Sequence, residues 1–156
     1  MSDAASRFPQ VVVVGTDGSG GARRAMEWTA LLARSAGASV RAVHVLTYDR
    51  ELFRDLSPDT MTTWRRNLED ELQRSWIAPL AEHGVAHRCA LVEDASPAAG
   101  LMGIAEREQA DLIVVGANRA TGLASRVLGS TGYSLTHRAH RPVVVVPATW
   151  QPHEPD

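Results

Sequence analysis

The segments VVVVGTDGS, residues 11–19, and LIVVG, residues 112–116, decide the fold of this 156-residue chain. Each holds a run of branched apolar residues that ends in glycine, which is typical of strands buried on both faces. Three further apolar runs lie at 40–46, 85–92 and 143–146. The sequence therefore predicts five strands, and we expect the first and the fourth to lie at the centre of the sheet.

Helical patterns separate these runs. The first repeats small and apolar residues every three or four positions, with Ser19 as its N-cap and Gly37 as its C-cap. The second opens on Ser57-Pro58, a cap followed by a proline at the first helical position. We expect one continuous helix from there to a stop at Gly84. Its predicted buried side carries Met61, Trp64, Leu68, Leu72, Trp76 and Leu80.

Two more helices complete the alternation. One starts at Ser96-Pro97, and the last runs from Ser130 to about Ala139. Strands that alternate with helices form parallel sheets with right-handed crossovers. The chain is therefore predicted to be α/β, an open, doubly wound, five-stranded parallel sheet with helices on both faces and the Rossmann-like or flavodoxin-like order 3-2-1-4-5. Its third strand mixes charged with apolar residues and is predicted to be an edge.

The domain is expected to span residues 9–148. Residues 1–8 are expected to be disordered and residues 149–156 to form a flexible tail, because two prolines and no periodicity leave little to pack. The first residues lack the apolar stretch of a signal peptide, and no apolar run approaches the roughly 18 residues of a membrane-spanning helix. We therefore expect a cytoplasmic protein with no membrane partner.

Composition excludes several chemistries. The formal charge of −2 argues against a nucleic-acid partner, since binding polyphosphate needs clustered excess cation. All 16 basic residues are arginine, which excludes a lysine Schiff base and the lysine of a GxxxxGK[ST] phosphate loop. Cys89 is the one cysteine, so no internal disulfide is possible. His137 and His140 have no acidic or cysteine partner nearby, and we expect no metal site.

No catalytic residue is predicted. Nothing in the sequence forms an acid/base pair, and His44 follows an alternating strand pattern that favours a packed residue. The expectation is a protein that is not an enzyme.

Two strand ends are candidates for a ligand site, because open parallel sheets bind ligands beyond the carboxyl ends of strands where strand order reverses. The first strand ends in Gly15-Thr16-Asp17, which brings a carboxylate to the turn. The fourth ends at Gly116, and residues 117–128 form a connection longer than the usual two to six or so. This length favours a site over a solvated surface loop.

The same connection leads into Gly129-Ser130, where backbone amides at a helix start can hold an anion. Arg119 and Arg126 lie within it and suit phosphate in a chain without lysine.

The last apolar run is the sequence PVVVVP, residues 142–147. An exposed edge of this kind recruits other chains. The sequence therefore predicts a homodimer sealed through the strand Val143 to Val146.

The chain resembles the universal stress proteins over residues 11–147. The matching pieces are, in order, VVVVGTDGS, AVHVL, the ASP turn before the third helix, DLIVVGANRATGLASRVLGS and PVVVVP. Nucleotide-binding members of that family carry a glycine, two residues, a second glycine, nine residues, then glycine and serine or threonine. Gly116, Gly129 and Ser130 stand at three of these places, and Arg119 stands at the second.

The resemblance implies a dimeric stress-response protein that binds ATP or a related adenine nucleotide, with Mg²⁺ as a companion of the phosphates. Slow, incidental ATP hydrolysis is the most catalysis that we then expect. It implies that Asp17 lies near the adenosine and that the backbone of Val45 lies against the base. The implied site consists of Gly15, Thr16, Asp17, Val45, Gly116, Arg119, Gly129, Ser130 and Thr131.

Arg119 leaves two readings open. Arginine binds phosphate through its side chain, but it lacks the conformational freedom and the close backbone approach of glycine. If it blocks the phosphates, the chain is a dimeric interaction module that has lost its ligand. A third reading, a small hydrolase or transferase that uses ATP, would show turnover of bound ATP.

Overall fold

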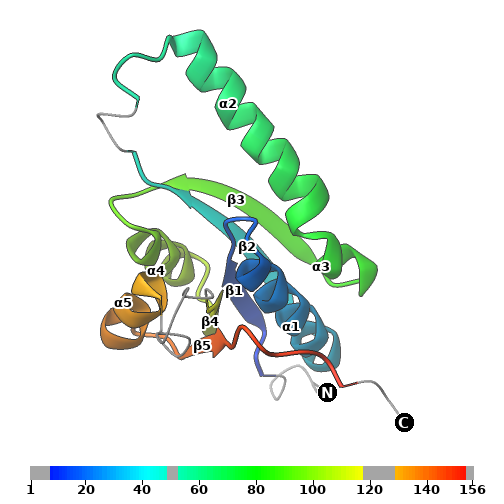
Figure 1. Cartoon of the computed structure of the whole chain (residues 1–156). Coiled ribbons are helices and arrows are strands. Elements are labelled where there is room, and N and C mark those ends of the chain that lie inside the picture. The colour runs from blue at the N-terminus through cyan, green and yellow to red at the C-terminus, as the bar shows by residue number, and fades with distance from the viewer. Residues whose placement is uncertain (1–7, 49–52, 118–128, 154–156) are drawn as a thin grey trace.

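The computed structural model describes residues 8–48, 53–117 and 129–153. Five strands form one parallel sheet in the order β3-β2-β1-β4-β5, which confirms the predicted topology (Figure 1). The elements in chain order are β1 (Val11–Gly15), α1 (Gly20–Ala36), β2 (Ser39–Leu46), α2 (Pro58–Glu71), the π-helical turn η2 (Leu72–Trp76), α3 (Ala78–Glu82), β3 (His87–Glu93), α4 (Pro97–Arg107), β4 (Leu112–Gly116), α5 (Ser130–Arg138) and β5 (Val143–Val146).

Helices cover both faces of the sheet, as predicted. Successive side chains of a strand point to opposite faces. In β1, Val12 and Val14 pack with α1 and α3, whereas Val13 packs with α4 and α5. Figure 1 shows α1 on one side of the sheet and α4 with α5 on the other. The three valines are fully buried, so β1 is the centre of the core.

The caps of α1 are those that the sequence predicts. The hydroxyl of Ser19 accepts a hydrogen bond from the N–H of Ala22 at 3.2 Å. Gly37 ends the helix with φ 69, a left-handed conformation that glycine adopts without strain.

The predicted helix between Pro58 and Gly84 is interrupted. The π turn η2 follows α2, and Ile77 separates η2 from α3. Pro79 explains the interruption, because its ring has no N–H and would clash with the carbonyl of Ser75, four residues earlier in an unbroken helix. The expectation of one continuous helix is therefore wrong.

The interruption divides the predicted buried side of this segment. Leu72 and Leu80 are buried in the core, whereas Trp64 and Leu68 on α2 are only half-buried. No residue of α2 is buried, and Figure 1 shows this helix projecting beyond β3.

Contacts at the end of β3 hold α2 in place. The Tyr48 hydroxyl donates to the Glu93 carboxylate at 2.7 Å, and Arg65 of α2 forms an ion pair with the same oxygen. The hydrogen bonds from Tyr48 and Arg65 hold the pKa of Glu93 below its usual range. Phe53 packs its ring 5.2 Å from that of Trp64.

β3 is an edge strand, as predicted, but it begins two residues later than expected. Gly84 turns the chain with φ 66, and the N–H of Val85 donates to the carbonyl of Leu80 at 2.9 Å. Val85 therefore still belongs to the end of α3, and pairing with β2 starts at His87.

The two ends of the chain are described in part. Residues 1–7 and 154–156 lie outside the described residues, and the boundary at residue 148 stays a prediction, although Trp150 packs against the core beyond it. None of the helices in the described ranges is long and apolar enough to cross a membrane.

Replacing Leu72 tests whether residues 58–84 enter the hydrophobic core only from η2 onward. Leu72→Ala should lower the free energy of unfolding by about 2–5 kcal/mol, since its side chain is fully buried. Leu68→Ala, the same change one turn earlier on α2, should cost less than about 1.5 kcal/mol because this side chain is half-exposed. Urea unfolding measures both, and equal losses would contradict the division at η2.

Candidate functional site

A cleft opens where β1 and β4 end, in the middle of the sheet. The helix after β1 covers one face and the helix after β4 covers the other, so the chain leaves these neighbouring strands in opposite directions. This is the reversal of strand order at which open α/β sheets bind ligands. The cleft holds about 660 Å³, the open solvent at its mouth included.

Eight of the nine predicted site residues line this cleft: Gly15, Thr16, Asp17, Val45, Gly116, Gly129, Ser130 and Thr131. The ninth, Arg119, lies outside the described residues, as does Arg126. Segments more than a hundred positions apart in the chain thus meet at one place.

The turn between β1 and α1 is held by its own side chains. The hydroxyl of Thr16 accepts from the N–H of Gly18 at 3.2 Å, and Asp17 Oδ1 accepts from the N–H of Ser19 at 2.9 Å. Gly18 adopts φ 76, which favours glycine. Asp17 is exposed, and its second oxygen, Oδ2, has no hydrogen-bond partner in the part of the chain that the structure describes. This oxygen is available to a ligand.

β2 extends beyond the end of β1, which leaves backbone groups unpaired. The last link between the two strands runs from the N–H of Thr16 to the carbonyl of Val43, at 2.9 Å. Alternate residues of a strand turn their N–H and C=O to the same side, so Val45 turns both groups toward the same side as Val43. Among the described residues neither group of Val45 has a partner on that side. Val45 therefore offers one donor and one acceptor to the cleft.

The first turn of α5 forms the opposite wall. Gly129 is its N-cap, and the first bond of the helix runs from the N–H of Tyr133 to the carbonyl of Gly129 at 2.9 Å. The N–H groups of Ser130, Thr131 and Gly132 consequently have no partner in the described ranges. Such N–H groups, at the positive end of the helix dipole, attract an anion.

The glycines at positions 116 and 129 of the motif are glycine for different physical reasons. A Cβ at Gly116 would lie 2.1 Å from the carbonyl oxygen of Gly21 in α1, so this glycine is required by packing. A Cβ at Gly129 would have no described atom within 4 Å, and φ is −54, an ordinary value. No described neighbour requires a glycine at position 129; its missing side chain leaves space on the cleft.

Sequence reasoning missed His44. The strand pattern predicts a packed ring, and the ring does pack edge to face against Trp76. The residue also lines the cleft, and its Nδ1 lies 2.7 Å from the carbonyl oxygen of Thr16. Pro97 and Leu101 of α4 also line the cleft, and the cap signal at Ser96 would have placed the start of that helix beside it.

The ionisable side chains in the described lining are Asp17 and His44. Over residues 8–48, 53–117 and 129–153, no group of three or more His, Cys, Asp or Glu side chains is placed to hold a metal ion. The cleft therefore combines backbone groups and one free carboxylate oxygen, an arrangement suited to binding.

Residues 9–147 match the model of the universal stress protein family. A universal stress protein of Methanocaldococcus jannaschii is 31% identical over 145 residues, which cover 86% of this chain and 80% of that protein.

Two solved structures share the fold. One, a universal stress protein from Archaeoglobus fulgidus in complex with dAMP, is 20% identical with a TM-score of 0.62, over 88% of this chain and 97% of the other. The second, a universal stress protein family protein from Arabidopsis thaliana with AMP bound, is 22% identical with a TM-score of 0.62, over 89% and 92%. With the family model and the M. jannaschii relative, the chain belongs to the universal stress protein family.

Proposed function

We propose that the cleft binds an adenine nucleotide, ATP or a related one, and that the protein is a cytoplasmic stress-response regulator that senses this nucleotide. The observation that carries the proposal is two sets of backbone groups on opposite walls of one cleft, neither of which has a hydrogen-bond partner among the described residues. Val45 offers an N–H and a C=O on one wall, and the first turn of α5 offers three N–H groups on the other.

The two sets suit the two ends of a nucleotide. Adenine presents an amino donor beside a ring-nitrogen acceptor, which complements a backbone C=O and N–H. Phosphate oxygens accept hydrogen bonds from the amides at a helix start. Asp17 Oδ2 would then accept from a ribose hydroxyl between them. The family relatives crystallised with AMP and dAMP support an adenine nucleotide as the ligand.

Magnesium would enter with the nucleotide. Mg²⁺ prefers oxygen ligands and is commonly bound through phosphates, one or two carboxylates and water. Asp17 is the carboxylate of the described lining, so a Mg²⁺ ion would depend mainly on the phosphates.

We propose binding without turnover. A catalyst for hydrolysis needs a base within reach of the attacking water. Asp17 Oδ1 is engaged by Ser19, and His44 Nδ1 is engaged by Thr16. In the proposed arrangement Asp17 Oδ2 bonds the ribose. His44 lies on the α2 side of the sheet, whereas the phosphates would lie at the start of α5, which covers the other face.

The alternative is a dimeric interaction module without a ligand. One observation favours it: Arg119 replaces the second glycine of the family motif. In that case the cleft would persist as part of the fold, and replacing the arginine by glycine would restore binding.

Nucleotide carried through purification tests the proposal. Acid denaturation should release an adenine nucleotide into the supernatant, and the emptied protein should bind AMP or ATP in calorimetry. Arg119→Gly distinguishes the two roles of the arginine. The affinity for AMP or ATP should fall if the arginine side chain binds phosphate, and it should rise if the side chain blocks the phosphates. If neither protein binds an adenine nucleotide at millimolar concentration, the nucleotide function is excluded.

The two glycines provide matched variants for the position of the phosphates. Gly129→Val should weaken AMP binding about tenfold or more by filling the space at the helix start, while the free energy of unfolding changes by less than about 1 kcal/mol. Gly116→Ala should instead lower that free energy by about 1–3 kcal/mol, because its Cβ meets the backbone of Gly21. Unchanged affinity in a folded Gly129→Val would contradict the proposed phosphate position.

We also propose a homodimer sealed through β5. In the described part of the chain β5 pairs with β4 alone and forms an edge of the sheet. The carbonyl of Pro142 accepts from Ile113 of β4, and that of Val146 accepts from Ala117, directly after β4. The N–H and C=O of Val143 and Val145 therefore turn outward. A two-fold axis would pair these groups with those of a second copy.

Proline at position 145 tests this interface. Val145→Pro removes an outward N–H and leaves the bonds to β4 in place, so it should give a folded monomer in sedimentation experiments at micromolar concentration. Val145→Thr keeps the N–H and should remain dimeric. A monomeric wild type, or a dimeric Val145→Pro, would contradict a dimer through β5.

A further inference from the structure

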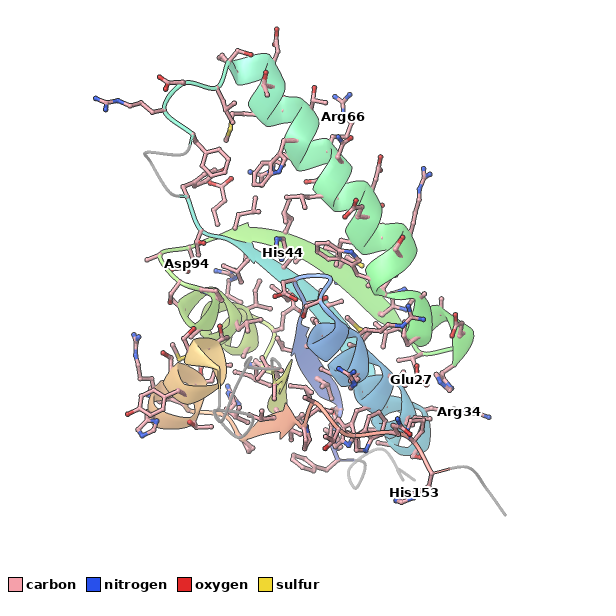
Figure 2. The ribbon with its side chains drawn as sticks, in the orientation of Figure 1. Glu27, Arg34, His44, Arg66, Asp94 and His153 are labelled. Atoms are coloured by element: carbon pink, nitrogen blue, oxygen red, sulfur yellow. The ribbon has the colours of Figure 1, made fainter. Side chains whose placement is uncertain are left out.

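His44 makes a hydrogen bond that decides where the ladder between β1 and β2 ends. Its Nδ1 lies 2.7 Å from the carbonyl oxygen of Thr16. A carbonyl only accepts, so Nδ1 carries the proton and donates it. Figure 2 shows His44 on β2, on the side of the sheet toward α2.

The partner of this bond would otherwise belong to the sheet. In a parallel ladder that already joins the N–H of Thr16 to Val43, the next bond joins the carbonyl of Thr16 to the N–H of Val45. That bond is absent from the described part of the chain, and the ladder stops at Gly15 and Val43. His44 occupies the carbonyl from the face of the sheet instead.

The side chain of Thr16 likewise keeps the carbonyl of Val45 out of the ladder. A further rung would join the N–H of Gly18 to the carbonyl of Val45. The N–H of Gly18 instead donates to the hydroxyl of Thr16, at 3.2 Å. The side chains of His44 and Thr16 therefore bind the Thr16 carbonyl and the Gly18 N–H, the two groups that would extend the ladder. The N–H and C=O of Val45 are left without a partner on this side among the described residues.

Trp76 fixes the His44 ring and the turn together. The two rings meet edge to face, with centroids 5.2 Å apart and an interplanar angle of 81°. A Cβ at Gly18 would lie 2.5 Å from Cε2 of Trp76, so the indole packs directly against this glycine. Trp76 is the last residue of η2, and π turns of this kind often occur at functional sites.

We propose that His44 is a positioning residue for the ligand: it holds the carbonyl of Thr16 away from Val45 and so keeps the N–H of Val45 free for the base. The inference rests on the proposed nucleotide function, which it deepens by identifying what makes the base-binding edge available. Trp76 supports the ring in this role. His44 itself does not need to touch the nucleotide.

Substitutions at His44 give a signature that general destabilisation does not. In His44→Leu the carbonyl of Thr16 is free to accept from Val45, so hydrogen exchange at the Val45 amide of the ligand-free protein should become slower, by about tenfold or more. A merely structural defect would make that exchange faster. The same variant should weaken AMP binding about fivefold or more, because the N–H for the base is occupied.

Four further variants complete the test. His44→Asn carries a donor nitrogen on Cγ, as histidine does, and should bind AMP within about twofold of wild type. His87→Leu removes a histidine bond to the Val85 carbonyl, 2.7 Å long and outside the cleft, and should leave both readings unchanged. Trp76→Leu should weaken AMP binding, whereas Trp64→Leu, the same change on α2, should not.

Val45 amide exchange and AMP affinity together distinguish a failure of this inference from a failure of the proposed nucleotide function. Slower Val45 exchange in His44→Leu supports the inference even if no AMP binds, in which case only the nucleotide function fails. Unchanged or faster Val45 exchange in a folded His44→Leu overturns it. So does AMP affinity equal to wild type in that variant, or a His44→Asn protein that binds as weakly as His44→Leu.

Discussion

The contact between the end of β4 and the first turn of α1 is the constraint on which the cleft depends. Gly116 allows the carbonyl of Gly21 to approach so closely that even a methyl group would not fit. This approach lets α1 start directly beside β4 while α5 crosses to the other face. The cleft lies where β1 and β4 end, and the first turns of α1 and α5 both contribute to its lining.

The site uses backbone groups that the fold leaves without partners. At the end of β2 the ladder stops because side chains of His44 and Thr16 take the groups that would extend it. At the start of α5 the N–H groups have no partner among the described residues, because a helix cannot bond its own first turn. A chain without lysine can bind phosphate in this way, and the composition that excludes several catalysts is compatible with such a cleft.

The buried valines of β1 and the Ser19 cap follow from patterns within short segments. The strand order follows from the alternation of strands and helices along the whole chain, and the family resemblance predicts eight of the residues that line the cleft. Individual contacts between distant segments were not predictable. Pro79 indicates a broken helix, whereas the apolar residues spaced around it favour a continuous one. The role of His44 depends on where another strand stops, 28 positions earlier, and the different reasons for Gly116 and Gly129 depend on neighbours far away in the chain.

A titration of the ¹⁵N-labelled protein with AMP, followed by amide chemical shifts, tests the central claim most directly. The largest shifts should occur at Val45 and at Ser130 to Gly132, the two walls of the cleft. Absence of shifts at millimolar AMP, or shifts gathered on α2 or β3 with these amides unmoved, would contradict it.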